Sequence, residues 1–179
     1  MDRVRAELNL EVSGRPAKST SAIVDKLRRS SMRLTQMQDI AGCRIAVPGI
    51  AEQNWLVDEL VLMFNMGIVD RRSRPSSGYR AVHIIVRSSP LPVEIQIRTE
   101  LQHLWAELSE KLADRFGFEL KYGGGPEAMR RILIELSDSI HQIETRTDVP
   151  SFSVEDKVIV KQQIRLAMLN VSIALKKEP

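Results

Sequence analysis

Residues 93–99, Val-Glu-Ile-Gln-Ile-Arg-Thr, alternate strictly between apolar and polar side chains. Successive side chains of a β-strand point to opposite faces, so this period of two predicts a strand with Glu94, Gln96 and Arg98 on one face, about 7 Å apart. Two interpretations are open. Either the carboxylate, amide and guanidinium form a functional surface, or the strand is half exposed and its polar face lies in solvent. The rest of the chain favours the functional surface.

The composition is that of a globular protein with a core. The chain has 179 residues, of which 43% are hydrophobic and 27% are charged. No apolar run reaches the roughly 20 residues that a membrane span requires, and no apolar segment of signal-peptide length follows the amino terminus. Cys43 is the single cysteine, so an internal disulfide is excluded. We therefore expect a cytoplasmic protein that contacts no membrane.

Periodicity and turn signals predict a mixture of helices and strands. Apolar residues at helical spacing predict helices at 22–29, 52–64, 100–116, 126–144 and 153–175. Thr99 is the expected cap of the third helix and Pro126 the expected start of the fourth. Strands are predicted at 40–47, 81–87 and 93–98, and the last two form a hairpin. One or two further strands are expected between the helix at 52–64 and this hairpin. The expected fold class is therefore α+β, a mixed and mainly antiparallel β-sheet flanked by helices, with C-terminal helices.

Two carboxylates are candidates for a metal site. Asp39 precedes the predicted strand at 40–47, and Glu94 lies on the polar face of the strand at 93–98. Carboxylates from neighbouring strands are what Mg²⁺ needs beside the phosphates of a substrate. Each residue also has a simpler interpretation, Asp39 as a helix or turn cap and Glu94 as a surface residue of a strand.

Basic residues accumulate before and within the predicted sheet: Arg15, Lys18, Lys26, Arg44, Arg71, Arg72, Arg74, Arg80 and Arg98. Guanidinium and ammonium groups beside such carboxylates indicate a nucleotide polyphosphate, although each residue alone is more simply a solvated surface charge. Tyr79 ends the basic loop after Gly78, where it can either stack on a purine base or lie on an apolar surface patch. The scattered histidines exclude a local zinc pattern.

Five motifs occur in order along residues 14–117, and their combination resembles the synthetase domain of the RelA/SpoT alarmone synthetases, particularly the short single-domain members. The motifs are Arg15 and Lys18 with the basic run at 26–29, Asp-Ile-Ala-Gly-Cys-Arg-Ile at 39–45, Gly-Tyr-Arg-Ala-Val-His at 78–83, Glu-Ile-Gln-Ile-Arg-Thr at 94–99 and Gln-His-Leu-Trp-Ala-Glu at 102–107.

The resemblance implies a Mg²⁺-dependent pyrophosphokinase with a nucleotidyltransferase-like synthetase fold in residues 1–125 and C-terminal helices in residues 126–179. Such an enzyme moves the β,γ-diphosphate of ATP to the ribose 3′-hydroxyl of GDP or GTP. Asp39 and Glu94 would be catalytic and bind the metal. By the same resemblance, the ATP ligands would be Arg15, Lys18, Lys26, Arg44 and Arg74, and the acceptor ligands Tyr79, Arg80, Gln96, Arg98 and His103.

Alternatives to this function stay open. Some short relatives are toxins that place pyrophosphate on the 3′ end of tRNA, and the basic loop at 71–78 suits a tRNA backbone. A catalytically inactive nucleotide sensor is a third possibility, which intact Asp39 and Glu94 disfavour. The apolar stripes of the last two helices either cover the sheet or form a homo-oligomer interface. An antitoxin would be the expected protein partner of a toxic member.

Overall fold

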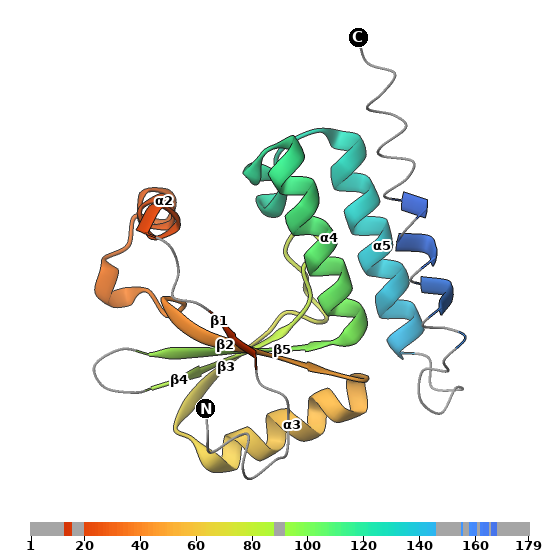
Figure 1. Cartoon of the computed structure of the whole chain (residues 1–179). Helices are drawn as coiled ribbons and strands as arrows, with labels where there is room; N and C mark the ends of the chain where they lie inside the picture. The colour runs from red at the N-terminus through yellow and green to blue at the C-terminus, as the bar shows by residue number, and fades with distance from the viewer. Residues whose placement is uncertain are drawn as a thin grey trace. The chain divides into compact units, whose positions relative to one another are not determined.

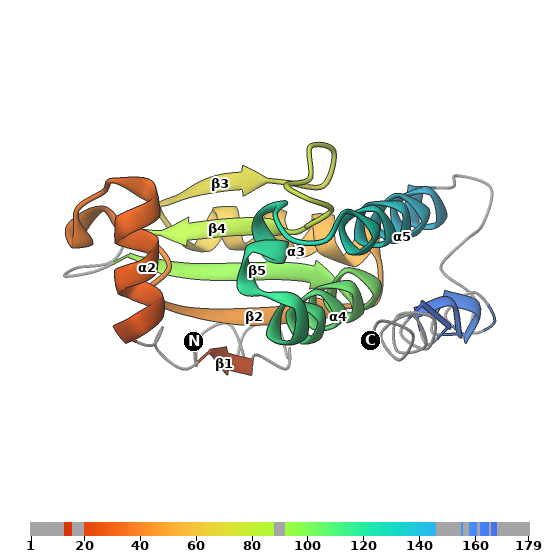
Figure 2. The same cartoon turned by 90° about the horizontal axis from the view of Figure 1, so that it is seen from above.

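The computed structural model describes residues 13–15, 20–87, 92–145, 155, 158–160, 162–164 and 166–167 (Figures 1 and 2). The chain divides into two compact units. The first comprises Met1–Val47, Ala51–Asp70 and Ala81–Arg98, and the second comprises Pro48–Ile50, Arg71–Arg80 and Thr99–Pro179. The division between residues 125 and 126 stays a prediction, because it concerns the extent of the synthetase region rather than local compactness.

The first unit contains a five-stranded sheet in the order β1-β2-β5-β4-β3. The strands are β1 (Ser13–Arg15), β2 (Ala41–Val47), β3 (Met66–Asp70), β4 (Val82–Val86) and β5 (Val93–Thr99). The pairs β1–β2, β3–β4 and β4–β5 are antiparallel. At the centre, Gly42 near the start of β2 lies against Glu94 near the start of β5, as in a parallel pair. The predicted mixed, mainly antiparallel sheet is confirmed.

Helix α3 (Ile50–Met63) covers one face of the sheet, and α2 (Thr20–Ser30) lies on the side of the opposite face (Figures 1 and 2). The core under α3 is formed by alternate residues of three strands and two leucines of the helix: Cys43, Ile45, Val47, Leu56, Leu60, Val82, Ile84, Ile95 and Ile97. Gln53 is also buried in α3, and its Nε2 donates to the carbonyl oxygen of Ile97 at 2.9 Å. Since this face takes the apolar half of each strand, the polar half must face the other way.

The second unit is helical. It contains α4 (Glu100–Phe116), the 3₁₀ turn η2 (Phe118–Tyr122) and α5 (Glu127–Thr145), and its described residues between 155 and 167 are also helical. Their apolar stripes meet in one core that includes Trp105, Leu112, Leu133, Ile140 and Ile164. These helices confirm the predicted stripes, while the remainder of the helix predicted at 153–175 lies outside the described residues. No helix among the described residues is long and apolar enough to cross a membrane.

The cap predicted for α4 is confirmed in detail. The Thr99 hydroxyl accepts from the amide of Gln102 at 3.1 Å, and the Gln102 side chain accepts from the amide of Thr99 at 3.2 Å. This reciprocal capping box satisfies two amides that the first turn of a helix leaves unpaired. It ends β5 and begins α4 at consecutive residues.

Candidate active site

The polar residues of β5 are buried rather than solvated. Glu94 is 8% exposed, Gln96 is 6% exposed and Arg98 is 4% exposed. The interpretation of β5 as a half-exposed strand with an ordinary polar face is therefore wrong. A buried carboxylate and guanidinium require partners, because transferring an unpaired charge from water into the protein is costly.

The three side chains form a hydrogen-bonded row along the strand. Arg98 donates from Nη2 to Oε1 of Gln96 at 3.0 Å, and Gln96 donates from Nε2 to Oε2 of Glu94 at 2.7 Å. The other carboxylate oxygen of Glu94 lies 2.6 Å from Nδ1 of His83. An ionised carboxylate can only accept, so Nδ1 of His83 is the donor in this contact. The row therefore fixes both oxygens of Glu94.

Opposing influences act on the Glu94 carboxyl. Burial by itself raises its pKa, but the hydrogen bond and charge of His83, followed by the hydrogen bond from Gln96, outweigh burial and hold the pKa below its ordinary value. The charge of Asp39 acts in the opposite direction and raises the pKa of Glu94. Glu94 is thus an ionised, oriented carboxylate in the electrostatic field of a second carboxylate.

Asp39 lies two residues before β2, and its Oδ1 is 2.8 Å from Nζ of Lys26 in α2. Within the described residues, no three or more His, Cys, Asp and Glu side chains gather into a site that could hold a metal ion. Asp39 and Glu94 are hard oxygen ligands, so they fit a site in which phosphate oxygens of a substrate complete the coordination of Mg²⁺. The assignment of Mg²⁺ to these two carboxylates stays a prediction.

The remaining ATP candidates of the first unit lie near the same strands. Arg44 is half-buried in β2, on the face opposite to the core residues Cys43 and Ile45. Arg15 is the last residue of β1 and pairs in register with Gly42. Lys18 lies outside the described residues. Their roles as ATP ligands stay predictions.

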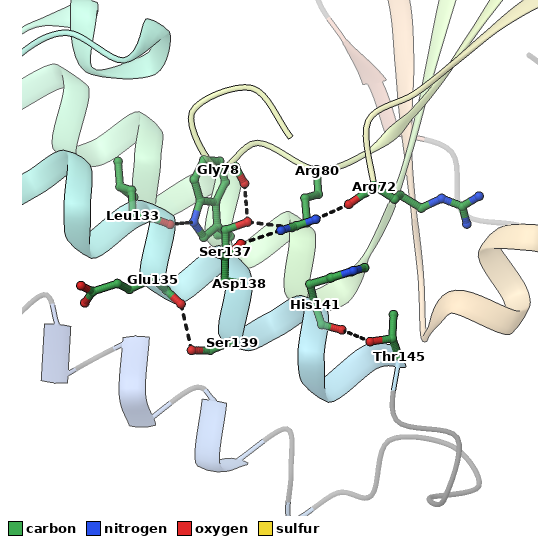
Figure 3. Close-up of polar contacts among 11 residues, drawn as sticks. Arg72, Gly78, Arg80, Leu133, Glu135, Ser137, Asp138, Ser139, His141 and Thr145 are labelled. Carbon is green, nitrogen blue, oxygen red and sulfur yellow. Dashed lines mark hydrogen bonds and ion pairs between the residues drawn. The ribbon is translucent and has the colours of Figure 1, made fainter. Parts of the chain in front are cut away.

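The second unit holds Arg74, Tyr79, Arg80 and His103. Arg74 is exposed, and Nε2 of His103 lies 3.5 Å from Oε1 of Glu107 on α4. Tyr79 is half-buried against the helical core, with its ring centroid 6.4 Å from that of Trp105 and a tilt of 56°. The Arg80 guanidinium donates to the carbonyl oxygen of Arg72 in the loop and to Ser137 and Asp138 of α5 (Figure 3).

Sequence reasoning missed three kinds of residue in these sites. His83 lies in the motif at 78–83 and pairs in register with Gln96, which places both side chains on one face of the sheet. The predicted hairpin does not specify which residue of β4 lies beside which residue of β5. Ser137 and Asp138 of α5 hold Arg80. Glu144 accepts from Thr99 and, at 3.0 Å, from Gln102. No local pattern distinguishes these helix residues from ordinary solvent-facing polar positions.

Comparison with known proteins places these residues in a family context. Residues 14–114 match the family described as a region found in RelA / SpoT proteins. An uncharacterized protein of Mycobacterium tuberculosis is 44% identical over 118 residues, which cover 63% of this chain but only 43% of that protein. The chain therefore spans less than half the length of that relative.

A sequence match and a crystal structure from Bacillus subtilis are similar over more of their length. GTP pyrophosphokinase YjbM is 30% identical over 149 residues, covering 74% of this chain and 67% of YjbM. The crystal structure of small alarmone synthetase 1 bound to its product pppGpp superposes with a TM-score of 0.62 at 28% identity, covering 80% of each chain. The sheet and helices described above are thus those of a synthetase structure.

Proposed function

This chain belongs to the RelA/SpoT family, and from that premise we propose that it is an ATP-dependent pyrophosphokinase of the cytoplasm. It transfers the β,γ-diphosphate of ATP to the ribose 3′-hydroxyl of GDP or GTP and releases AMP. The observation that carries the proposal is the buried carboxylate of Glu94, which is held ionised by His83 and Gln96 in the field of Asp39. The names of the Bacillus relatives, a GTP pyrophosphokinase and a synthetase bound to pppGpp, support the same reaction class.

The two carboxylates have distinct roles in this proposal. Glu94, held by both oxygens, accepts the proton of the attacking hydroxyl or binds the metal, and Asp39 binds the metal. Magnesium, when bound, offsets the negative charge that builds up on the transferring diphosphate. Lys26, already within 2.8 Å of Asp39, is then positioned to bind phosphate oxygens of ATP.

Two sets of side chains bind the nucleotides. Arg15, Lys18, Arg44 and Arg74 complete the ATP side together with Lys26. Gln96, Arg98, Tyr79 and His103 serve the acceptor, with the half-buried Tyr79 stacking on the base. Transfer of this kind depends on positioning and charge neutralisation more than on covalent chemistry, which suits a site built from carboxylates and basic residues.

The test follows the γ-phosphate of labelled ATP. Purified protein is incubated with Mg²⁺ and γ-labelled ATP, with GDP, GTP or deacylated tRNA supplied in parallel, and products are separated by thin-layer chromatography. Label in a guanosine polyphosphate supports the proposal. Label only on tRNA would make the chain a tRNA-modifying toxin, for which an antitoxin partner is expected, and label that stays on ATP throughout would favour the sensor.

Variants at the two carboxylates identify the site. Glu94→Gln and Asp39→Asn should abolish transfer and leave the far-UV circular dichroism spectrum unchanged, because each removes a charge with little change in volume. Glu110→Gln is the matched control, since Glu110 is an exposed carboxylate of α4. Turnover retained in either site variant would refute the assigned roles.

A further inference from the structure

The loop that carries Tyr79 ends in a tight turn. The amide of Tyr79 donates to the carbonyl oxygen of Ser76 at 2.9 Å, and the two central residues, Ser77 and Gly78, have φ of 52° and 87°. Two consecutive positive φ values are the sign pattern of a type I′ turn, a conformation that ordinary side chains disfavour. A turn of this kind needs support from its surroundings.

Helix α5 supplies that support through one hydroxyl and one carboxylate (Figure 3). Ser137 Oγ donates to the carbonyl oxygen of Gly78 at 2.5 Å and accepts from Nε of Arg80 at 2.9 Å. The carboxylate of Asp138 accepts from Nη2 of Arg80 at 2.7 Å, and the carbonyl oxygen of Arg72 accepts from Nη1. Three nitrogens of one guanidinium thus join the two ends of the loop to consecutive residues of α5.

Close packing holds the turn in the same place. A Cβ on Gly78 would lie 2.7 Å from the Trp105 ring and 3.1 Å from the carbonyl oxygen of Leu133, so only glycine fits between α4 and α5. The Trp105 indole donates to that same carbonyl oxygen at 2.8 Å. Tyr79, the next residue after Gly78, packs on this core beside Trp105.

Arg80 is poorly placed to bind a ligand itself. It is 6% exposed, and three of its five N–H groups already have protein acceptors. Burial of a guanidinium is tolerated where its hydrogen bonds are satisfied in fixed geometry, and that geometry also fixes the backbone to which its partners belong. Arg80 therefore links the loop to α5, and we call Arg80 together with Ser137 and Asp138 the brace.

We propose that Ser137 and Asp138 of α5, acting through Arg80, are positioning residues that hold the loop of Tyr79 in the shape that binds the acceptor nucleotide. Arg80 on this view positions the acceptor loop and does not itself contact the acceptor. The proposal rests on the proposed function for its link to the acceptor, and on the contacts within the second unit for the brace. It makes α5 part of the acceptor site.

The first test compares the kinetics of α5 variants. Ser137→Ala and Asp138→Ala should each raise the KM for GDP about tenfold, the effect of losing one hydrogen bond to a charged group, with kcat and the KM for ATP within about twofold of wild type. Ser139→Ala and Glu135→Ala are matched controls on the same helix. The hydroxyl of Ser139 donates within α5, to the carbonyl oxygen of Glu135 at 2.8 Å (Figure 3), and the Glu135 side chain is 70% exposed. Equal KM values in test and control variants would overturn the proposal.

A double-mutant cycle separates bracing from direct ligand binding. Arg80→Lys keeps the positive charge but loses the fork that reaches three acceptors. If Arg80 acts through α5, adding Asp138→Ala to Arg80→Lys should raise the KM for GDP by much less than the product of the two single effects. Multiplicative effects would show that Arg80 acts on the acceptor independently of α5, which contradicts the proposal.

Hydrogen exchange tests the brace without relying on activity. The Tyr79 amide should exchange about tenfold faster in Ser137→Ala than in Ser139→Ala, because the turn opens more often once its support is lost. The two proposals fail in different assays. If the wild-type chain transfers no label to any guanosine nucleotide, the proposed function is refuted. If the exchange rate of the Tyr79 amide is the same in Ser137→Ala and Ser139→Ala, the brace is refuted, whatever the label-transfer result. Faster exchange together with an unchanged KM for GDP would refute the link to the acceptor.

Discussion

Gly42 is the position where one added methyl group tests the geometry of the site most directly. It lies in β2, three residues after Asp39, and a Cβ there would stand 2.5 Å from the carbonyl oxygen of Glu94 in β5. That oxygen belongs to the backbone, so no side chain can rotate away to relieve the clash. Gly42→Ala must therefore move the neighbouring strands β2 and β5 apart.

The size of the effect follows from the contact. Ordinary van der Waals contact begins at 3.4 Å, so the strands must separate by about 0.9 Å in a core that is packed without free space. Overpacking of this kind lowers the free energy of unfolding by about 1–3 kcal/mol. Moving β2 away from β5 also moves Asp39 away from Glu94. A displacement near 1 Å between reacting groups lowers the catalytic rate by roughly a hundredfold.

The assay pairs urea unfolding with the label-transfer rate. Gly67→Ala in β3 is the matched control, because no atom of the described residues other than its chain neighbours lies within 4 Å of an added Cβ, and its φ is not positive. That variant should keep its turnover and gain about 0.4–1 kcal/mol through a less flexible unfolded chain. If Gly42→Ala matches Gly67→Ala in both stability and turnover, the close approach of β2 and β5 does not set the carboxylate geometry.

Other perturbations address single contacts. His83→Phe removes the donor to Glu94 and should lower kcat about tenfold or more, measured by label transfer, whereas an unchanged kcat would mean that Gln96 alone holds the carboxylate. Tyr79→Ala should raise the KM for GDP far more than the KM for ATP, and equal changes would argue against base stacking. Burial raises the pKa of Glu144 despite its hydrogen bonds, so the folded chain keeps a proton that the unfolded chain releases. The free energy of unfolding should then fall as pH rises from the ordinary pKa of a glutamate through the raised one, and urea titrations across pH should show this slope reduced in Glu144→Gln. An identical slope in that variant would assign the pH dependence to other groups.

Much of the fold follows from local pattern. Strict alternation predicted β5, helical spacing predicted α3, α4 and α5, and Thr99 gave the start of α4, because each depends on residues within a few positions of one another. The strand at 66–70 was expected only as one of one or two strands in that part of the chain. β3 is an edge strand in which Ile68 and Val69 are exposed. Its sequence therefore lacks the alternation of buried and exposed side chains by which a central strand is predicted.

In the candidate site, too, some features follow from the sequence and others only from the tertiary structure. The sequence by itself determined the family, through the order of its motifs, and it determined that Glu94, Gln96 and Arg98 share a face. The roles of Asp39, Glu94 and the basic residues stay predictions. Only tertiary structure decided that this face is buried, that His83 reaches Glu94, and that Arg80 is held by Ser137 and Asp138, 57 and 58 residues away. Periodicity records which residues point the same way along one element. Register between strands and contact between distant helices depend on how the whole chain packs, which no single window of sequence contains.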